Sequence, residues 1–219
     1  MIGIFGGTFD PIHFGHLRPV TEVAAALPFR EIRFVPCRVP PHRPQPEATP
    51  KQRWYMLTRV VGRTPGLVAD DRELRREGTS YTVDTLEELR RELGPDEPLG
   101  LIMGSDAFGS LHTWHRWEDI PALAHIIVMR RPGATLPNQG EIADFLEGTR
   151  LENPADLLAR PAGGVYVQDV TPQEVSSTAV RACIRGGGQP RYMIPGPVWS
   201  YIRRVGLYRG NDANCGTDE

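Results

Sequence analysis

Short apolar runs alternate along this chain with longer segments whose apolar residues recur at helical spacing. Most of the runs end at glycine, proline or arginine, as a buried strand does where it leaves a sheet. The runs that we interpret as strands cover residues 1–7, 32–36, 67–69, 99–103, 125–129 and 164–167. Strands that alternate with helices predict an α/β fold with a mostly parallel sheet.

Helices are expected between and after these strands. Residues 82–93 show the pattern well, because the apolar side chains share one face and Gly-Pro follows them. Residues 133–163 are rich in proline, glycine and polar side chains, and we expect a surface excursion there with one helix near 142–146. A single domain is predicted over residues 1–209, followed by a disordered tail at 210–219. Further helices are predicted at residues 17–27, 52–61, 178–184 and 198–205.

The charge balance excludes some classes of partner. Lys+Arg 25 against Asp+Glu 27 gives a net charge of -2, which offers no broad basic surface for duplex nucleic acid. A local basic cleft for a phosphorylated metabolite stays compatible with it. No stretch reaches the roughly 20 apolar residues of a membrane span, and no charged leader precedes the first strand. We therefore expect a cytoplasmic protein with no nucleic-acid or membrane partner.

The basic residues limit how anions are bound. Lys51 is the only lysine, and it lies far from any glycine-rich loop. This argues against a Walker A loop and against a pyridoxal Schiff base, since each needs a lysine. Anionic ligands must then be held by arginine, histidine, backbone N–H groups or a metal. The cysteines, Cys37, Cys183 and Cys215, have no zinc-site spacing and are expected to be reduced.

The first candidate site follows the first strand directly, as the string GGTFDPIHFGH over residues 6–16. Glycines allow a backbone to approach a ligand closely. His13 and His16, three residues apart at the start of a helix, lie on one face beside N–H groups that have no intrahelical partner. Together they predict an anion site, in which Gly15 leaves room for a nucleotide to lie against the helix.

The second candidate site is the string VSSTAVR over residues 175–181, which opens a predicted helix. Ser177 and Thr178 are expected to cap this helix, and its first N–H groups can receive phosphate oxygens. Arg181 lies one turn further on, where its guanidinium can form paired hydrogen bonds with phosphate. Taken alone, this pattern is typical of any capped helix.

The two strings together resemble the HxGH and ISSTxxR motifs of the nucleotidyltransferase superfamily, with Val in place of Ile in the second. That resemblance implies a Rossmann-like sheet with helices on both faces. It also implies in-line attack on the α-phosphorus of a nucleoside triphosphate without a covalent enzyme intermediate. Five more segments, in order and spacing, look like bacterial nicotinate-nucleotide adenylyltransferases, and the likeness runs from about residue 2 to 209. They are residues 39–43, 80–86, 104–106, 113–114 and 130–133.

The resemblance implies an ATP site in which His13, His16 and Arg181 are catalytic. Mg²⁺ would arrive with ATP and keep several waters, because no carboxylate cage for a metal is evident and no residue is predicted as a metal ligand. The nucleophile is a phosphate and already an anion, so no general base is predicted. The residues placed at ATP are Gly6, Gly7, Thr8, Phe9, His13, His16, Gly104, Asp106, Ser177, Thr178 and Arg181.

The acceptor implied by the resemblance is nicotinate mononucleotide. Trp114 would stack on its ring, and the turn at residues 81–85 would surround its carboxylate. His115 departs from the family pattern, which has Tyr beside the stacking Trp. The residues placed at the acceptor are Tyr81, Thr82, Val83, Thr85, Trp114 and His115.

Several alternatives stay open at this point. The acceptor could instead be a nicotinamide nucleotide or phosphopantetheine, although residues 80–86 and 113–114 argue against both. A fragment of an aminoacyl-tRNA synthetase also uses an HxGH string, but no lysine-rich second signature is present. A non-catalytic nucleotide sensor would retain the fold without the reaction. Arg43 and Arg131 fit both a binding role and a surface role, and the oligomeric state is left unspecified.

Overall fold

The computed structural model describes residues 1–40 and 44–210, so Arg43 and residues 211–219 of the expected tail lie outside the described residues. One seven-stranded sheet forms the centre of the molecule, in the order β3-β2-β1-β4-β5-β7-β6, and every pairing in it is parallel. The predicted α/β fold is thus confirmed, with a sheet that is parallel throughout. The strands are β1 Ile2–Gly7, β2 Glu31–Pro36, β3 Leu67–Ala69, β4 Leu99–Gly104, β5 His125–Arg130, β6 Arg150–Leu151 and β7 Val165–Asp169.

The order of the strands reverses next to β1. From β1 the chain builds outward through β2 to β3, then returns to place β4 on the other side of β1. In an open parallel sheet, such a reversal leaves a crevice beyond the carboxyl ends of the two central strands, and ligands bind there. This topology places the candidate site at the ends of β1 and β4.

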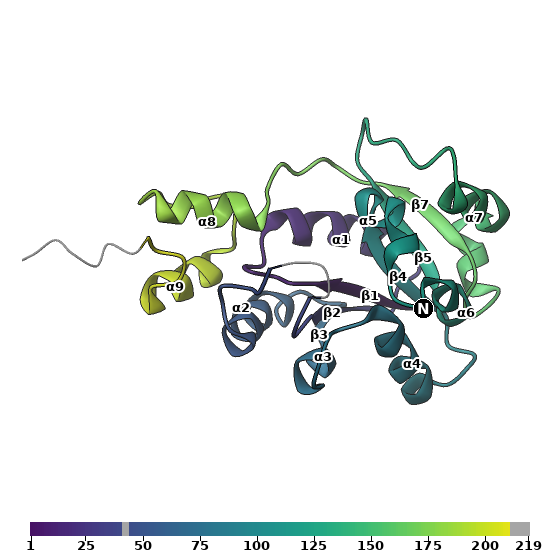
Figure 1. Cartoon of the computed structure of the whole chain (residues 1–219), viewed down its shortest axis with the longest axis horizontal. Coiled ribbons are helices and arrows are strands. Elements are labelled where there is room, and N and C mark those ends of the chain that lie inside the picture. Colours follow the sequence, from purple (N-terminus) through teal and green to yellow (C-terminus); the bar gives the residue numbers. More distant parts are fainter. Residues whose placement is uncertain (41–43, 211–219) are drawn as a thin grey trace, which may run out of the picture.

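Helices cover both faces of the sheet, and α8 and α9 form the yellow-green end of the molecule in Figure 1. Helix α1 begins at Phe14, three residues before the first predicted position, and α2 begins at Pro50 behind a capping box at Thr49 and Gln52. The α-helices are α1 Phe14–Ala26, α2 Pro50–Val61, α3 Arg72–Arg75, α4 Thr82–Leu93, α5 Ser105–Gly109, α6 Ile120–Leu123, α7 Glu141–Thr149, α8 Ser177–Arg185 and α9 Gly196–Val205. The short 3-10 helices are η1 Leu111–Thr113, η2 Trp117–Asp119 and η3 Pro154–Leu158.

Alternation along the strands divides the core into two layers. In β1, Phe5 points into the layer formed with α1, α2, α8 and α9, whereas Ile4 points into the layer formed with α4, α5, α6 and α7. The same alternation separates Ile127 from Ile126 in β5. Each fully buried side chain of this size stabilises the fold by about 1.5–3 kcal/mol. Buried side chains therefore pack against both faces of the sheet, and the loops at its carboxyl edge extend from this packed core.

The segment 133–163 is more than the surface excursion that its composition predicts. It contains α7, as expected, but it also adds β6 beside β7 at the edge of the sheet. Ile142, Leu146 and Leu157 are buried and belong to the core. A few apolar residues spaced among polar ones suffice to anchor this segment, and its overall polarity hides them.

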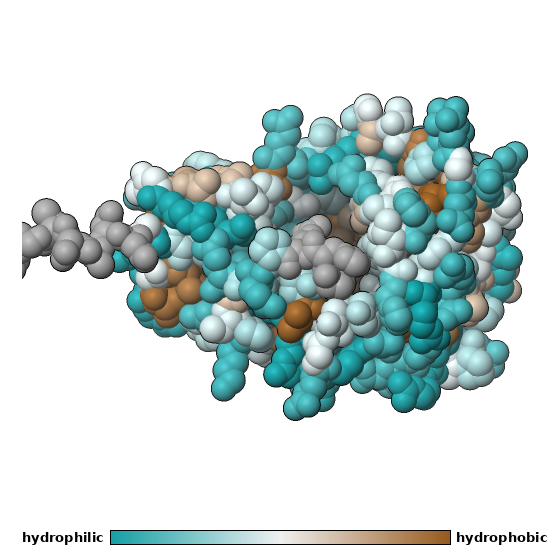
Figure 2. Space-filling view, in the orientation of Figure 1, coloured by the Kyte–Doolittle hydropathy of each residue, from teal (hydrophilic) through white to brown (hydrophobic). Residues whose placement is uncertain are grey.

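The face shown in Figure 2 is largely hydrophilic, and its brown apolar areas are separate from one another. No helix within the described residues has both the length and the apolar character needed to cross a bilayer. Cys37 and Cys183, the two cysteines that the structure describes, form no disulfide.

Candidate active site

The two histidines of the first string lie together at the start of α1. His13 is the N-cap residue, and its backbone N–H donates to Nδ1 of His16 at 3.3 Å. The two imidazole rings stack with centroids 3.6 Å apart and an interplanar angle of 27°. Because Nδ1 of His16 accepts a hydrogen bond here, a neutral imidazole at this position carries its proton on Nε2. The N-terminus of α1 thus holds two imidazoles, and the backbone N–H groups of Phe14 and His16 in its first turn donate to the carbonyl oxygens of Met193 and His13.

His13 is held in its neutral form. Its side chain is 4% exposed, and its Nδ1 has no hydrogen-bond partner among the described residues. Burial lowers the pKa of His13 to about 4, and the nearby charge of Arg131 acts in the same direction. Arg131 therefore belongs to the electrostatic surroundings of the site. The His13 side chain faces the backbone N–H of His16 in a capping box without meeting strict hydrogen-bond geometry.

The loop between β1 and α1 has a fixed conformation. Phe9 is buried, with φ of 50° in the left-handed region, which costs on the order of 1–3 kcal/mol in a residue other than glycine. Its ring lies 2.8 Å from where a Cβ on Gly7 would be, so only glycine fits at that position. The ring of Phe9 lies in the core, so the contact predicted between this residue and ATP could involve only its backbone.

The second string joins the first in space. Ser177 at the start of α8 donates from its Oγ to the carbonyl oxygen of Pro11 at 3.1 Å. The cap itself is Ser176, whose Oγ accepts from the backbone of Ala179 at 3.1 Å, so the expected capping by Ser177 and Thr178 is wrong. Thr178 is exposed in the first turn of α8. The N-termini of α1 and α8 therefore meet at one place, although 166 residues separate Pro11 from Ser177.

Gly15 has a different role from the one expected. A Cβ at this position would collide with the carbonyl oxygen of Val175 and approach Nδ1 of His13 at 2.9 Å. The space beside Gly15 is thus occupied by the protein, where we had expected a nucleotide. The glycine is required because the segment before α8 packs directly against the first turn of α1.

Arg181 reaches from α8 to the loop before His13. Its Nη1 donates to the carbonyl oxygen of Asp10 at 2.8 Å, and its Nε lies 2.8 Å from Oε1 of Glu47. The Nε contact is an ion pair without hydrogen-bond geometry, since the same atom has no hydrogen-bond partner in the described residues. Glu47 is also paired with Arg185. The guanidinium of Arg181 therefore lies beside the loop that carries the two histidines.

Two glycines leave the backbone open at the carboxyl edge. Gly6 in β1 and Gly104 at the end of β4 would both meet nothing within 4 Å if a Cβ were added. Asp106 follows Gly104 in the first turn of α5 and is exposed. Because β1 and β4 are neighbours in the sheet, these residues line one edge, where we expected the adenosine side of ATP.

The residues expected at the acceptor gather where α4 begins and η1 ends. The rings of Tyr81 and His115 lie 4.3 Å apart with an interplanar angle of 34°, and Trp114 is half-buried against the core. The first intrahelical bond of α4 runs from the N–H of Thr85 to the carbonyl of Tyr81. The N–H groups of residues 82–84 precede that bond. Like the first N–H groups of any α-helix, they have no intrahelical acceptor.

Two residues expected at the acceptor have buried side chains, and the contact of the 81–85 turn with a ligand through its backbone stays a prediction. Val83 is fully buried in the core, so its side chain cannot reach a ligand. Thr85 is 1% exposed; its Oγ1 donates to Oε1 of Glu73 and accepts from Nη2 of Arg76, both at 2.7 Å. Burial raises the pKa of Glu73, which lies deep in this network. Val83 packs into the core and Thr85 binds Glu73 and Arg76, so both side chains support the first turn of α4.

Three residues that support the site were not assigned this role from the sequence. Arg53 is fully buried, and its Nη1 donates to the carbonyl oxygens of Thr8 at 2.8 Å and Cys37 at 2.7 Å. Asp10 is buried and accepts from Tyr208 near the end of the chain. Arg53 and Tyr208 carry no local signal, since an arginine in an amphipathic helix and a tyrosine after one are commonly at the surface.

A bound metal would depend on the nucleotide. Within residues 1–40 and 44–210, no three His, Cys, Asp or Glu side chains lie close enough to form a metal site. Both carboxylate oxygens of Asp10 already accept hydrogen bonds, and Asp106 is exposed in the first turn of α5. These donors fit a cation that reaches the cleft with a triphosphate and is ligated mainly by phosphate oxygens and water.

Comparisons with known proteins show the family to which this chain belongs. Residues 4–183 match the cytidylyltransferase-like family. A probable nicotinate-nucleotide adenylyltransferase of Aeromonas hydrophila is 45% identical over 95% of this chain and 97% of its own length. One from Methylococcus capsulatus is 46% identical over 95% of this chain and 99% of its own length.

A solved structure shows the same fold. The Plasmodium falciparum nicotinic acid mononucleotide adenylyltransferase complexed with NaAD has a TM-score of 0.69 and 20% identity. The superposition covers 94% of this chain and 96% of that one. The chain therefore belongs to the cytidylyltransferase-like family and, within it, to the nicotinate-nucleotide adenylyltransferases.

Proposed function

We propose that the cleft at the ends of β1 and β4 transfers the adenylyl group of ATP to nicotinate mononucleotide. The products are nicotinate adenine dinucleotide and pyrophosphate. One observation carries this assignment of the site: Ser177 and Arg181 both donate to the loop before His13, so that two helix N-termini and their basic side chains converge. Such a convergence suits a polyphosphate, which needs several donors at once.

ATP would place its phosphates between the starts of α1 and α8. His16 offers its Nε2–H to an oxygen near the α-phosphorus, and the neutral His13 lies behind it. Arg181 would exchange its ion pair with Glu47 for the triphosphate, to which it can donate through two nitrogens. The open backbone at Gly6 and Gly104 would admit the adenosine moiety, with Asp106 beside it.

The transfer itself forms one P–O bond and breaks another. A phosphate oxygen of nicotinate mononucleotide attacks the α-phosphorus of ATP, and the oxygen that bridges to the β-phosphorus leaves with its electron pair as pyrophosphate. The nucleophile is already charged, so no proton needs to be removed. Charge builds on the α-phosphate oxygens and on the leaving group, and positioned donors stabilise it. Magnesium bound to the triphosphate would neutralise further charge.

The acceptor would lie between the start of α4 and Trp114. The N–H groups of residues 82–84 can donate to the ring carboxylate, and the indole of Trp114 can stack on the pyridine. Tyr81 and His115, which stack on each other, would border this pocket. His115 occupies the position at which the family pattern has Tyr, and a stacked imidazole can fill the same flat space.

We also propose a cytoplasmic location for the reaction.

One experiment tests the assignment directly. Purified protein is incubated with ATP, magnesium and, in turn, nicotinate mononucleotide, nicotinamide mononucleotide or phosphopantetheine, and the products are identified by mass. Nicotinate adenine dinucleotide as the main product is expected. Turnover of phosphopantetheine alone would assign another acceptor, and no turnover with any acceptor would favour a nucleotide sensor.

A matched pair of variants tests the site. Arg181 and Arg185 both pair with Glu47, but only Arg181 also donates to the loop before His13. We expect Arg181→Gln to raise the KM for ATP and lower kcat, whereas Arg185→Gln removes the same charge one turn away and keeps both values. Equal losses in the two variants would mean that charge alone, and not the position of Arg181, matters.

A further inference from the structure

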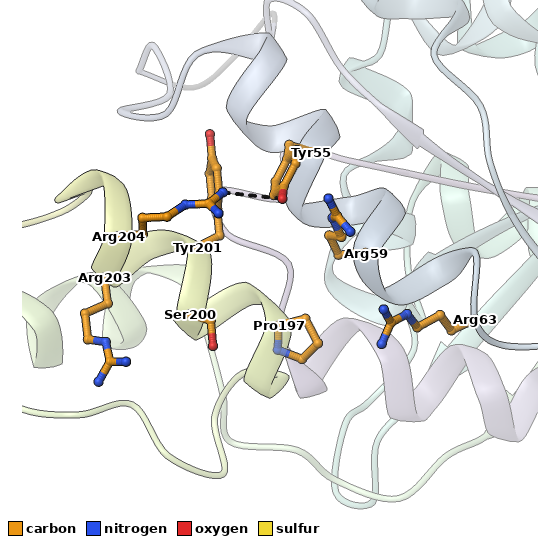
Figure 3. A pocket seen from close by; sticks show the side chains of 8 residues that line it. All are labelled: Tyr55, Arg59, Arg63, Pro197, Ser200, Tyr201, Arg203 and Arg204. Carbon is orange, nitrogen blue, oxygen red and sulfur yellow. Dashed lines mark hydrogen bonds between the residues drawn. The ribbon is translucent and has the colours of Figure 1, made fainter.

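A second basic site lies on the surface between α2 and α9, in a pocket of about 450 Å³ that shares no lining residue with the candidate active site. Half of its eight lining residues are arginines, and none is acidic. Figure 3 shows the arginines coming from α2, from the turn that follows it and from α9, with two tyrosine rings among them. The charged and aromatic residues that line the pocket are Tyr55, Arg59, Arg63, Tyr201, Arg203 and Arg204.

The tyrosines hold two of the guanidinium groups in place. The rings of Tyr55 and Tyr201 lie 4.3 Å apart, one from each helix. The guanidinium carbon of Arg59 lies 4.6 Å from the Tyr55 ring centre, and that of Arg204 lies 5.6 Å from the Tyr201 ring centre. Nη2 of Arg204 also donates to Oη of Tyr55 at 3.4 Å, drawn as a dashed line in Figure 3. Ordered cations lose less conformational entropy when they bind an anion.

Within residues 1–40 and 44–210, no carboxylate balances the positive charge in this pocket. None of the four arginines forms an ion pair with a carboxylate of the described residues, whereas Arg72, Arg116 and Arg130 do so elsewhere in the chain. Arg59 lies in the last turn of α2, and Arg63 follows in the turn just after the helix ends at Val61. The whole chain has a net charge of -2, so a general excess of basic residues does not explain the cluster.

Helix dipoles explain only part of the arrangement. Arg59 lies in the last turn of α2, and Arg203 and Arg204 lie in the last turn of α9, where the dipole favours cations. The dipole acts along each helix separately, however, and does not require the arginines of two helices to line one concavity. The hydrogen bond from Arg204 lowers the pKa of the Tyr55 hydroxyl, and the charge of Arg59 acts in the same direction.

We propose that this pocket binds the phosphate groups of a small phosphorylated metabolite, separately from the transfer reaction. Guanidinium groups form paired hydrogen bonds with phosphate oxygens, and four of them match a ligand with more than one phosphate. The volume falls within the range of small-molecule sites. A pocket with all its cations in one hollow suits a compact anion better than an extended nucleic acid, which needs a basic stripe.

The test uses inorganic tripolyphosphate as the probe in calorimetric titrations of the whole chain at low ionic strength. Wild-type protein is expected to bind it at the pocket and at the cleft. The pocket variant Arg59→Gln/Arg204→Gln is expected to bind roughly 10- to 100-fold more weakly at one site and normally at the other. The cleft variant Arg181→Gln is expected to show the converse. Because Arg59 and Arg204 are exposed, the pocket variant should keep the wild-type melting temperature and kcat.

Two controls separate a built site from charge alone. Arg75→Gln/Arg150→Gln removes two exposed cations outside the pocket and should leave both sites intact. Arg59→Lys/Arg204→Lys keeps the charge but loses the planar fork, and its affinity should fall between wild type and the glutamine variant. Equal weakening in the two glutamine double variants, or unchanged binding in the pocket variant, would overturn the proposal.

Discussion

The hydroxyl of Tyr208 donates a 2.7 Å hydrogen bond to Oδ1 of Asp10, 198 residues earlier in the chain. The same carboxylate accepts from the backbone N–H groups of Glu47 at 2.9 Å and Ala48 at 3.1 Å. The loop after β1, the segment before α2 and the end of the chain thus meet at one buried side chain. Asp10 comes three residues before His13, so this contact fixes the loop that carries the histidines.

Tyr208 is itself held in an uncommon conformation. It is 5% exposed and has φ of 63°, in the left-handed region. Such a backbone costs on the order of 1–3 kcal/mol in a residue other than glycine, so surrounding contacts must hold it. Burial raises the pKa of its hydroxyl, and the nearby Asp10 acts in the same direction. Tyr208 therefore stays neutral and can act as a donor over the whole physiological pH range.

Tyr208→Phe should reduce stability and activity together. The change removes one donor from a buried carboxylate while keeping the ring, which costs about 1–3 kcal/mol of unfolding free energy. The loop before His13 loses one of its fixed points, so we expect a higher KM for ATP. Urea unfolding and initial rates measure the two effects. Tyr192→Phe is the matched control, because Tyr192 is 92% exposed, and it should change neither quantity. A Tyr208→Phe protein with wild-type stability would contradict a supporting role for this bond.

Most of the sheet could be predicted from the sequence because its strands are continuous apolar runs. Strands β1, β2, β3, β4, β5 and β7 all fall within or next to predicted runs. β6 could not be predicted, since two residues show no period. The short helices α3, α5 and α6 were missed for the same reason. The order of the strands in the sheet could not be predicted either, because it depends on contacts between segments that are distant in the sequence.

For the site, the motifs located the right loops but not the contacts within them. Gly15 and Ser177 join the two motifs to each other, whereas their spacing had suggested contacts with a ligand or a helix cap. Arg53 shows the limit most clearly. Its helical position predicts an ordinary side chain, yet it is fully buried and binds carbonyl groups of the loops after β1 and β2. Nothing local distinguishes such an arginine from an exposed one.

His13 should make stability depend on pH. Its pKa falls from 6.5 in the unfolded chain to about 4 in the folded protein. Between these values the unfolded chain binds a proton that the folded protein excludes, so acid favours unfolding. The contribution is complete above pH 6.5 and is lost as the pH falls toward 4, by on the order of 2–3 kcal/mol.

Urea unfolding of wild type and His13→Gln at pH 7.5, 5.5 and 4.5, values chosen to span this roughly 2.5-unit window, measures the effect. Glutamine does not titrate, so the free-energy difference between the two proteins should shrink as the pH falls. Burial also lowers the pKa of His125. Its effect on stability is the same in wild type and in His13→Gln, so it cancels in the difference between the two proteins. A difference that stays constant over this range would mean that His13 titrates normally in the folded protein.

His16 should act through its Nε2–H, and two substitutions separate this donor from the ring's other contact. Asparagine can replace Nδ1 as the acceptor from the backbone of His13, but it places nothing at Nε2. Glutamine can place an N–H near Nε2. We expect His16→Asn to fold normally and lose roughly 10²-fold or more in kcat, and His16→Gln to recover part of it. Steady-state rates and melting temperatures test this. Equal kcat in both variants would show that the Nε2 donor does not stabilise the transition state.

The start of α4 should make the enzyme prefer the acid acceptor over the amide acceptor. The N–H groups of residues 82–84 precede the first intrahelical bond of α4 and can donate to a ring carboxylate, which the helix dipole also favours. Asp84 lies in this turn and would repel an anion, but Nη1 of Arg76 lies 3.7 Å from its Oδ2 and offsets the charge. A carboxamide offers one acceptor oxygen, and its NH₂ group would face donors that it cannot pair with.

Each unpaired buried donor costs about 1–3 kcal/mol, so two of them give a preference of roughly 10²- to 10⁴-fold in kcat/KM for nicotinate over nicotinamide mononucleotide. Arg76→Gln should reduce this preference, because the charge of Asp84 would then be uncompensated. Trp114→Ala should instead weaken both acceptors alike, since an indole stacks on either ring. Measuring kcat/KM for both acceptors in the three proteins tests the argument. Comparable wild-type values for the acid and the amide would mean that the start of α4 is not a carboxylate site and that the enzyme accepts both nucleotides.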